Sequence, residues 1–364
     1  MKVLSLFDGI SCGRVALERA GLEVTEYYAS EIDKFAIQCA KENWKETIHI
    51  GSVCDVTFKD GILRTKEYVK KGKDVTVVDK EYNVGEIDLV IGGSPCQSFS
   101  VAGDGSGFDG KSGLFWEFMR VLKEVNPKYF LLENVVMKKE WQKVIDDAMG
   151  VEPIKVNSSL VSAQSRNRLY WTNIPNVTVP VDKGIILSDI LETNTDPSFD
   201  LSEAAIDYMN RHRNGKPRWE YHKNPVDGKA SCLTANMYKG VPYGVLQLRP
   251  MELRENSKMS KDGLHHIGNA TDIKGNESIK RVYADEGKAP TLTTSMGGHR
   301  EPKVAVDTVH YRKLTPLECE RLQTLPDNYT ASLSNTQRYK SIGNGWTVDV
   351  IAHIFKGLIE NDVL

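Results

Sequence analysis

The chain has 364 residues, of which 40% are hydrophobic, and its 47 Lys and Arg against 49 Asp and Glu give a formal net charge of −2. This length predicts one large domain plus a smaller one with a sizeable core, and the charge balance excludes a uniformly basic coat for nucleic acid. The six cysteines form no CxxC pair and stand apart from histidine at metal-ligand spacing, so we expect no disulfide framework, no metal site and a reducing compartment.

Strands and helices alternate along residues 1–175. In chain order, apolar runs predict strands at 3–7, 27–32, 48–50, 87–91 and 129–132, and helical spacing predicts helices at 14–20, 34–44 and 114–125. This alternation predicts an α/β fold, with a parallel sheet covered by helices on both faces. Ligands of such sheets bind beyond the carboxyl ends of the strands, so residues at those ends are the candidates for function.

A more irregular region begins near residue 186, where turn-forming and basic residues increase. Segments 228–237 and 287–296 share Gly, Lys, Ala, Leu, Thr and Met in register, but two copies are too few for a solenoid. Regular helical sequence returns near Thr315, and 348–359 predicts a final helix. We therefore expect a small, mostly β domain at 186–309, inserted into a larger domain formed by 1–185 and 310–364.

Polar turns follow three successive strands of the first half. The turn after Phe7 contains Gly9, which would let the backbone approach a ligand closely, although it lacks the GxGxxG dinucleotide fingerprint. Glu31 ends the second strand, where a carboxylate can accept bonds from ribose hydroxyls, and Asp55 follows the third. Each alone also fits a tight turn, a solvated strand end or an Asx turn. Their occurrence at successive strand ends indicates a nucleotide-like ligand.

Nucleophilic and acidic candidates follow the next two strands. Cys96 ends a Gly-Gly-Ser-Pro-Cys loop; a single cysteine is most often a small buried hydrophobe, but apolar packing does not need such a loop. Glu133 comes after the next strand, as a catalytic acid or as a structural carboxylate bonded to backbone amides. Gln164, Arg166 and Arg168 alternate, so an extended segment would place them on one face, which also fits a solvated strand.

In this order, these residues resemble the cytosine-5 DNA methyltransferases over nearly the whole chain. The matching pieces are Phe7-Asp8-Gly9, Glu31, Asp55, Pro95-Cys96-Gln97, Glu133-Asn134-Val135, Gln164-x-Arg166-x-Arg168, the 314–323 segment and Gly343-Asn344. Segments 90–96, 132–136 and 345–348 are similar to the mammalian de novo branch, and the middle region to bacterial and phage members. Ser11 and Cys12 replace glycines common in bacterial members, and Gly345-Trp346 replaces a smaller pair.

The resemblance implies a Rossmann-like S-adenosylmethionine-dependent methyltransferase sheet with an inserted target-recognition domain. It implies transfer of a methyl group from S-adenosylmethionine to carbon 5 of a flipped-out cytosine in double-stranded DNA, through a covalent bond between Cys96 and C6. By the same resemblance, protonated Glu133 would bond N3 and the exocyclic amine, Arg168 would hold O2, and Arg166 would support the active-site loop or the substrate. The implied cofactor contacts are Phe7, Asp8, Gly9, Ile10, Ser11, Glu31, Ile32, Asp55, Val56, Pro95, Leu114, Asn344, Gly345 and Trp346.

Candidate DNA contacts lie in two places. The glycine-rich loop between Ser98 and Gly113 follows the nucleophile and predicts a lid over the DNA, with a plain surface loop as the alternative. A basic cluster around Trp219 and Tyr221 suits phosphate contacts, although a charge run is often only a solvated face. The basic insertion at 59–85 predicts a solvated hairpin. The DNA-binding candidates are Gln97, Ser98, Arg211, Arg213 and Arg218.

Three other functions remain open. An RNA cytosine-5 methyltransferase and a small-molecule methyltransferase are disfavoured by the inserted domain, and a non-enzymatic DNA-binding regulator by the intact Cys96, Glu133 and Arg168. The N-terminus reaches Asp8 too soon for a signal peptide, and no run of about 18 apolar residues predicts a membrane span. We expect a monomer in the cytoplasm of a bacterium or of a phage-infected host cell, with any cognate restriction endonuclease acting separately.

Overall fold

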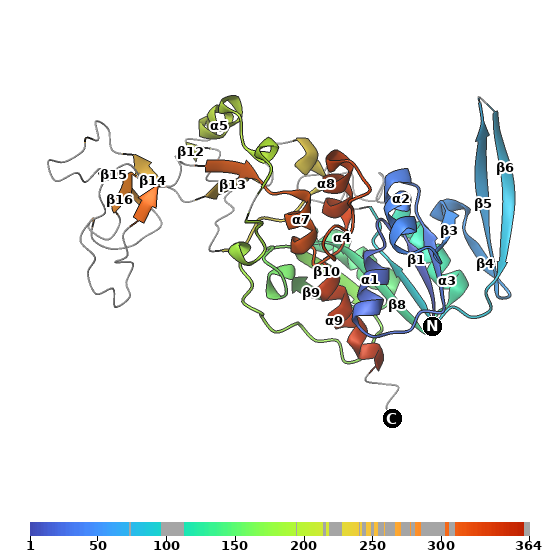
Figure 1. The fold of residues 1–364 in the computed structure, drawn as a ribbon. Helices are drawn as coiled ribbons and strands as arrows, with labels where there is room; N and C mark the ends of the chain where they lie inside the picture. The colour runs from blue at the N-terminus through green and yellow to red at the C-terminus, as the bar shows by residue number, and fades with distance from the viewer. Residues whose placement is uncertain are drawn as a thin grey trace. The chain divides into compact units, whose positions relative to one another are not determined.

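The computed structural model describes two compact units of the chain (Figure 1). The first contains Met1–Leu191, Lys229–Lys239 and Pro316–Leu364, and the second Glu192–Gly228 and Gly240–Thr315. Thus part of the region predicted as an insertion, Lys229–Lys239, belongs to the first unit. The described residues are 1–72, 74–95, 113–193, 195–213, 216–217, 228–239, 241, 245–248, 251–253, 258, 266–270, 277, 281–284, 303–305 and 310–359.

A seven-stranded sheet in the order β3-β2-β1-β7-β8-β10-β9 forms the centre of the first unit. The strands from β3 to β8 are parallel, as predicted, whereas β10 is antiparallel to both of its neighbours. The reason is the short connection at 158–166, because so few residues can join β9 to β10 only as an antiparallel pair. The strands are β1 (Lys2–Leu6), β2 (Glu26–Ser30), β3 (Ile48–Gly51), β7 (Leu89–Gly92), β8 (Tyr129–Val135), β9 (Ile154–Asn157) and β10 (Asn167–Thr172).

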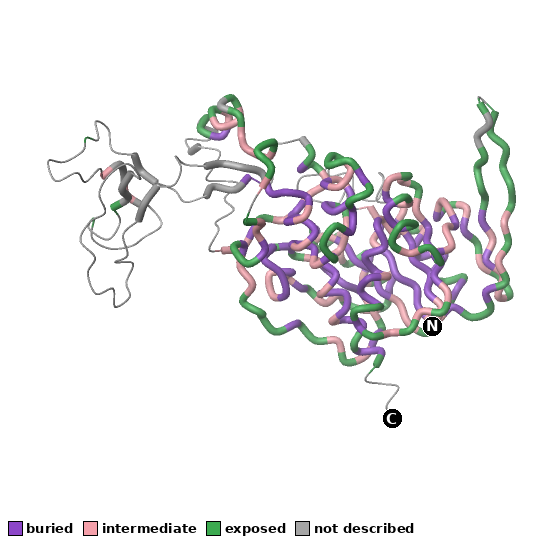
Figure 2. The backbone as a smooth tube through the Cα atoms, viewed as in Figure 1, coloured by how far each residue is buried: buried purple, intermediate pink, exposed green. Residues whose placement is uncertain are grey.

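Helices cover both faces of this sheet because its strands are apolar on both sides. In β7, Leu89 and Ile91 pack into one hydrophobic cluster and Val90 into the other, as expected for a strand buried on both faces. Purple stretches in Figure 2 follow these central strands. On the first face lie α1 (Cys12–Arg19), α2 (Lys34–Asn43) and α9 (Val348–Ile359), and on the second α3 (Leu114–Val125) and α4 (Lys139–Met149).

Strand β8 extends past Leu132, where the sequence predicted its end. Glu133 therefore lies inside the strand, in register with Tyr170 of β10. The longer strand follows from pairing, because β10 supplies backbone partners beside the polar residues that would otherwise end it. Consequently Glu133 sits on a rigid element.

A three-stranded antiparallel sheet follows β3 and contains the predicted hairpin. Its strands are β4 (Thr57–Lys59), β5 (Ile62–Lys71) and β6 (Asp74–Asn83). Leu63 and Thr65 near its root are buried, whereas Tyr68, Val75 and Val77 farther along are exposed. The hairpin is therefore buried at its base and exposed farther along.

Short elements complete the chain. The helices α7 (Pro316–Leu322) and α8 (Asn335–Asn344) belong to the first unit, as do the 3-10 turns η1 (Val53–Asp55), η4 (Ser158–Leu160), η5 (Leu187–Asp189) and η8 (Ala235–Lys239). The second unit contains η6 (Pro197–Phe199), α5 (Glu203–Asn210), β11 (His212–Arg213), β12 (Lys216–Pro217), β13 (Val245–Leu248), β14 (Met251–Leu253), β15 (His266–Ala270), β16 (Arg281–Ala284), β17 (Lys303–Ala305) and β18 (His310–Lys313). Across the described ranges, every helix is too short or too polar to span a membrane.

Candidate active site

The turn between β1 and α1 has an unusual backbone. Phe7, Gly9 and Ser11 all have positive φ, at 58°, 59° and 61°. Only Gly adopts this region without steric cost, so the surrounding contacts must hold Phe7 and Ser11 there. They do: the Asp8 N–H donates to Ser30 O at 3.0 Å and the Ser11 N–H to Asp8 O at 3.1 Å. The turn is thus rigid, and its shape depends on β2.

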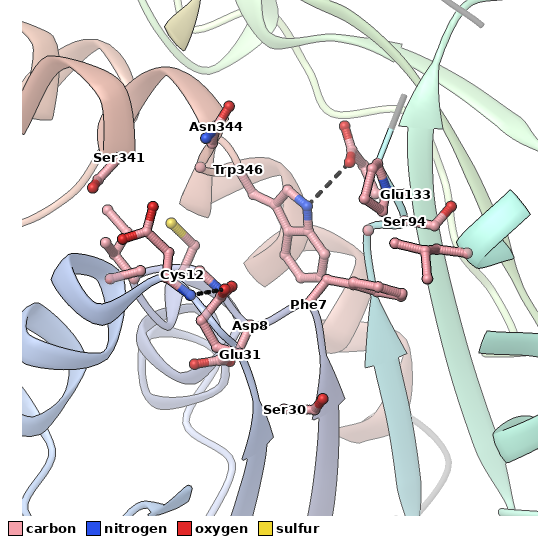
Figure 3. Close-up of a pocket in the computed structure, with 18 of the residues that line it drawn as sticks. Phe7, Asp8, Cys12, Ser30, Glu31, Ser94, Glu133, Ser341, Asn344 and Trp346 are labelled. Carbon is pink, nitrogen blue, oxygen red and sulfur yellow. Dashed lines mark hydrogen bonds between the residues drawn. The ribbon is translucent and has the colours of Figure 1, made fainter. Parts of the chain in front are cut away.

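Glu31, at the end of β2, is held by backbone amides. Its Oε2 accepts from Gly9 N at 2.8 Å, and its Oε1 accepts from Ile32 N at 2.7 Å and Asp33 N at 2.8 Å. A carboxylate has about four acceptor positions, so roughly one is left for a ligand hydroxyl. Glu31 is therefore fixed by backbone amides, unlike the solvated strand end that was its alternative, and these bonds orient it as a ligand acceptor (Figure 3).

Asp8 lies in the same turn with its carboxyl group directed inward. Tyr27 OH donates to Asp8 Oδ1 at 2.7 Å, and Ser11 Oγ donates to Oδ2. Burial raises the pKa of Asp8 from 3.8 to about 6; the hydrogen bonds from Ser11 and Tyr27 lower it, and the charge of Glu31 adds to the rise. Asp8 therefore exchanges its proton near neutral pH beside the cavity described below.

This environment predicts a pH-dependent stability. The folded chain keeps the Asp8 proton to higher pH than the unfolded chain, so its stabilising contribution is present below pH 3.8 and is lost as pH rises to about 6. Asp8→Asn removes the charge, so the free energy of unfolding of this variant should not depend on the protonation of residue 8. Relative to the unchanged protein, we expect the variant to be more favoured at pH 8 than at pH 4, by about 1–2 kcal/mol in the free energy of unfolding, a range that allows for partial solvent screening. Urea unfolding at both pH values measures this difference. Asp79→Asn on the exposed part of β6 is the control, and an equal change at both pH values for Asp8→Asn would contradict the expectation.

A cavity of about 430 Å³ opens at the carboxyl ends of the parallel strands. Its wall includes eleven of the predicted cofactor residues: Phe7, Asp8, Gly9, Ile10, Glu31, Ile32, Pro95, Leu114, Asn344, Gly345 and Trp346. It also includes residues that were not among the predicted site residues, mainly their neighbours in the sequence: Cys12, Ser30, Asp33, Ala36, Ser52, Val53, Cys54, Gly93, Ser94, Asn134, Val135, Ser341 and Gly343.

Three predicted cofactor residues lie outside this wall. Ser11 is buried beneath the turn, and Val56 is buried in the core on the α3 side. Asp55 accepts a hydrogen bond from Tyr68 OH of the hairpin at 3.2 Å, while its neighbour Cys54 lines the cavity. Ser11 thus acts on the cavity through Asp8 rather than by contact with its interior.

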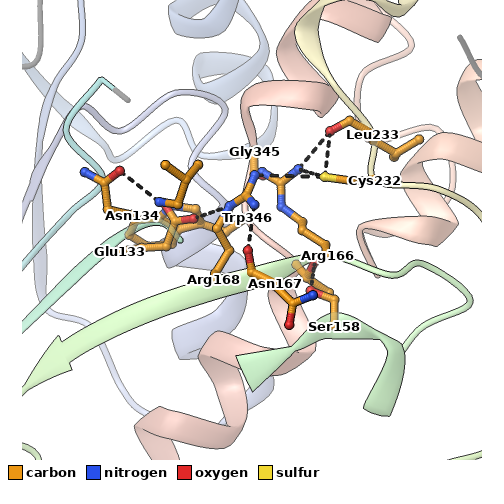
Figure 4. A network of polar contacts seen from close by, with 12 residues as sticks. Glu133, Asn134, Ser158, Arg166, Asn167, Arg168, Cys232, Leu233, Gly345 and Trp346 are labelled. Atoms are coloured by element: carbon orange, nitrogen blue, oxygen red, sulfur yellow. Dashed lines mark hydrogen bonds and ion pairs between the residues drawn. The ribbon is translucent and has the colours of Figure 1, made fainter. Parts of the chain in front are cut away.

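The cavity contains an acid and an arginine in direct contact. Arg168 Nε lies 2.9 Å from Glu133 Oε1, and Trp346 Nε1 donates to Glu133 Oε2 at 3.1 Å (Figure 4). The side chains of Arg168 and Glu133 are only 15% and 12% exposed, so this pair is screened less than a surface ion pair. The two oxygens of Glu133 therefore have fixed and different partners.

Arg166 lines the same cavity but bonds mainly to backbone carbonyls. Its guanidinium donates to Leu233 O at 2.9 Å, to Gly345 O at 3.0 Å and, at 3.5 Å, to Gly343 O and to the sulfur of Cys232. These bonds join the residue before β10, the C-terminal end of α8 and the 229–239 segment. In this geometry Arg166 orders the wall around Arg168.

The 229–239 segment is joined closely to the first unit. Ala230 exchanges backbone bonds with Ala163 and Ser165, and Gln164 Oε1 accepts from Leu233 N at 2.9 Å. A Cβ at Gly343 of α8 would lie only 2.3–2.5 Å from backbone atoms of Thr234 and Ala235. The absence of a side chain at 343 therefore allows this segment to contact α8.

Gly343→Ala should push the 229–239 segment away from α8. The added methyl group would clash with backbone atoms, which cannot move aside as a flexible side chain would. We expect a loss of about 1–3 kcal/mol in the free energy of unfolding. The urea midpoint followed by near-ultraviolet circular dichroism measures it, with Lys356→Ala on the exposed side of α9 as the control. Equal midpoints for Gly343→Ala and the unchanged protein would show that the segment does not pack as described.

Several predicted site residues lie outside the described residues: Cys96, Gln97, Ser98 and Arg218. Arg211 is exposed directly after α5, and Arg213 is described only as part of the backbone of β11, both in the second unit. Within the described ranges, His, Cys, Asp and Glu side chains form no group of three or more that could hold a metal ion. The predicted nucleophile and DNA contacts therefore stay predictions.

Comparison with known proteins gives consistent similarities. A family model described as C-5 cytosine-specific DNA methylase matches residues 1–360. The orphan methyltransferase M.Rho11sI of Bacillus phage rho11s is 26% identical over 530 residues, which cover 100% of this chain and 98% of that protein. The type II methyltransferase M1.ScrFI of Lactococcus lactis subsp. cremoris is 26% identical over 381 residues, which cover 99% of this chain and 78% of that protein.

A solved structure shows the same fold. The methyltransferase EhMeth of Entamoeba histolytica aligns with a TM-score of 0.64 at 16% identity, covering 99% of this chain and 98% of that chain. The predicted α/β methyltransferase fold is thereby confirmed.

Proposed function

Because the chain belongs to the C-5 cytosine-specific DNA methylase family, and is thus a DNA cytosine-5 methyltransferase, we propose that it acts on a cytosine flipped out of double-stranded DNA through a covalent bond between Cys96 and C6. One observation supports this most: Glu133 and Arg168 form an ion pair in a cavity whose wall also contains Pro95. Pro95 directly precedes Cys96 in the sequence.

The cavity suits S-adenosylmethionine as the methyl donor. Its volume falls in the range of roughly 300–1,000 Å³ that is usual for small-molecule sites. The remaining acceptor position of Glu31 suits a ribose hydroxyl, and Phe7 and Trp346 offer aromatic surface for the base and the carbon chain. When bound, this cofactor supplies an electrophilic methyl group. Asp55 and Val56, which lie outside the wall, are the weakest members of the proposed cofactor set.

In the proposed reaction the Cys96 thiolate attacks C6 of the cytosine. A sulfur–carbon bond forms, the C5–C6 double bond opens, and the electron density at C5 rises until it can bond the incoming methyl carbon. Removal of the C5 proton then returns an electron pair to the ring, the double bond re-forms and Cys96 leaves as thiolate. The bond between the methyl carbon and the cofactor sulfur would break as the bond to C5 forms, and the C5 proton would pass to water, so that one methyl group replaces one proton on C5.

Glu133 and Arg168 would stabilise the ring during the attack. Glu133, protonated, would donate to N3 and accept from the exocyclic amine, so that the negative charge created by the attack is relieved. Arg168, which already orients Glu133, would hold O2 of the base. Arg166 would keep this wall in place through its bonds to Leu233 O and Gly345 O. With these contacts already made, the groups would be positioned before the substrate binds, which would lower the cost of reorganisation.

A methyl-acceptor comparison tests the proposal. The protein and labelled S-adenosylmethionine are incubated with unmethylated duplex DNA, with tRNA and with each after nuclease digestion. We expect labelled 5-methylcytosine in the duplex DNA. Label in tRNA alone would instead assign the RNA-directed function, and label in neither would assign the non-enzymatic one. Base-resolution sequencing of DNA from an expressing, otherwise unmethylated host would then identify the recognition site, which Gln97, Ser98, Arg211, Arg213 and Arg218 are proposed to contact.

A further inference from the structure

The indole of Trp346 contacts both the cofactor cavity and Glu133. Its ring lines the cofactor cavity, while its N–H donates to Glu133 Oε2 at 3.1 Å (Figure 3). On the other oxygen, Arg168 Nε lies 2.9 Å from Oε1. A carboxylate with a separate donor on each oxygen cannot rotate without breaking at least one of these contacts.

The backbone around Trp346 is itself held in place. Gly345 O accepts from Arg166 Nη2 at 3.0 Å and from Gln323 Nε2 at 3.1 Å. On the other side, Thr347 Oγ1 donates to Gln323 Oε1 at 2.8 Å and accepts from Ser158 Oγ at 2.8 Å. The backbone on both sides of Trp346 is thus fixed by hydrogen bonds, and this holds the indole near Glu133.

Gly93 shows how closely the indole and the carboxylate fit. A Cβ at this position would lie 2.9 Å from Trp346 Nε1 and 3.1 Å from Glu133 Oε2, beside the hydrogen bond and in close contact with both of its atoms. Gly92 meets a different need, because its Cβ would lie 2.9 Å from Leu6 O and from the ring of Phe118. The Gly-Gly pair before Ser-Pro-Cys therefore has two separate functions, and the second glycine leaves room for the Trp346–Glu133 hydrogen bond.

From this geometry we infer that Trp346 is a positioning residue for Glu133: its indole N–H sets the direction of the catalytic carboxylate from within the wall of the cofactor cavity. The inference rests on the proposed function, since it assigns Glu133 to the cytosine ring. It also explains why a tryptophan, with its N–H, occupies a place that a purely apolar wall residue could fill.

Trp346→Phe tests whether the residue positions Glu133 or only forms part of the cavity wall, because phenylalanine keeps an aromatic surface but has no N–H. We expect the affinity for S-adenosylmethionine, measured by calorimetry, to change less than about threefold, whereas kcat at saturating cofactor and DNA falls about tenfold, equivalent to about 1.4 kcal/mol. Trp141→Phe in α4 is the matched control and should leave both quantities unchanged. An unchanged kcat in Trp346→Phe, with or without a loss of affinity, would leave Trp346 as wall only and overturn the inference.

Gly93→Ala tests the same hydrogen bond without changing either of its two partners. Its methyl group should displace the indole from the carboxylate and lower kcat to a similar extent. Because both changes remove one contact, the Gly93→Ala/Trp346→Phe double variant should be no slower than the slower single variant. Multiplied losses in the double variant would show that the two residues act independently, which would contradict the proposed geometry.

A spectroscopic measurement tests the contact without any reaction. In the ¹H–¹⁵N spectrum of the cofactor-free protein, the indole resonance that disappears in Trp346→Phe identifies Trp346. Glu133→Gln should move that resonance, whereas Glu140→Gln on the exposed side of α4 should not. If the Trp346 indole resonance has the same chemical shift in Glu133→Gln, the inference is overturned even if kcat falls in Trp346→Phe. Absence of methyl transfer by the unchanged protein would instead contradict the proposed function, and the resonance would still report on the contact.

Discussion

Cys96→Ser should reduce methyl transfer to duplex DNA by roughly 10³-fold or more, because the serine hydroxyl is a far weaker nucleophile than a thiolate toward C6. Serine is nearly the same size, so the fold and the cofactor cavity should be retained. Transfer of labelled methyl groups measures the loss, while calorimetry with S-adenosylmethionine and circular dichroism check binding and folding. Wild-type turnover in this variant would end the proposal that Cys96 is the nucleophile.

A suicide substrate gives an independent test of the same covalent step. Duplex DNA containing 5-fluorocytosine should form an adduct that survives denaturing electrophoresis, because fluorine at C5 cannot leave as a proton does. Cys96→Ser should form none, and Cys39→Ala, which alters a buried thiol of α2, should form as much as the unchanged protein. An adduct in the serine variant would assign the covalent bond to another residue.

Glu133→Gln should lower kcat by about 10²–10⁴-fold, the usual contribution of a positioned general acid. Glutamine is the same size but cannot donate a carboxyl proton to N3. In addition, both oxygens of Glu133 now face donors, Arg168 Nε and Trp346 Nε1, so the amide NH₂ would have to face one of them. We therefore expect the loss in kcat rather than in affinity for S-adenosylmethionine.

Single-turnover methyl transfer under saturating cofactor and DNA measures this effect directly. Glu140→Gln, an exposed glutamate of α4, serves as the matched control and should react at the unchanged rate. A Glu133→Gln rate within threefold of that control would mean that the carboxyl proton is not used in the chemical step.

Local patterns in the sequence were sufficient for many of the elements. The final helix was predicted at 348–359 and is observed as Val348–Ile359, and the helix at 114–125 also matches α3. Both have a strong apolar face, which depends only on the order of neighbouring residues. Most of the parallel strands were predictable for a similar reason, since β1, β2, β7 and β8 are each followed by a crossover helix.

Pairing between distant segments was not predictable in this way. The extension of β8 through Glu133 depends on β10, and the antiparallel direction of β10 depends on the short connection from β9. Membership of 229–239 in the first unit depends on contacts with 163–166 and with Gly343. No local pattern in 229–239 indicates these partners.

Glu31 and Asp55 show the same division within the site. Glu31 ends one predicted strand and Asp55 follows the next, and both were predicted as cofactor contacts. In the structure the turn after β2 brings three amides onto Glu31 at the cavity. Asp55 lies in η1, where successive side chains point about 120° apart, so Cys54 lines the cavity and Asp55 meets Tyr68 instead.

By itself, the sequence determined the α/β class, the order of the motifs and the residue types needed for methyl transfer, because apolar periodicity and motif spacing are properties of the linear chain. Only the tertiary structure decided which atoms meet: Glu133 between Arg168 and Trp346, and Gly93 beside their contact. The physical reason is that hydrogen bonds and ion pairs act over about 3 Å, a proximity that residues far apart in the chain acquire only when the sheet and its helices pack together.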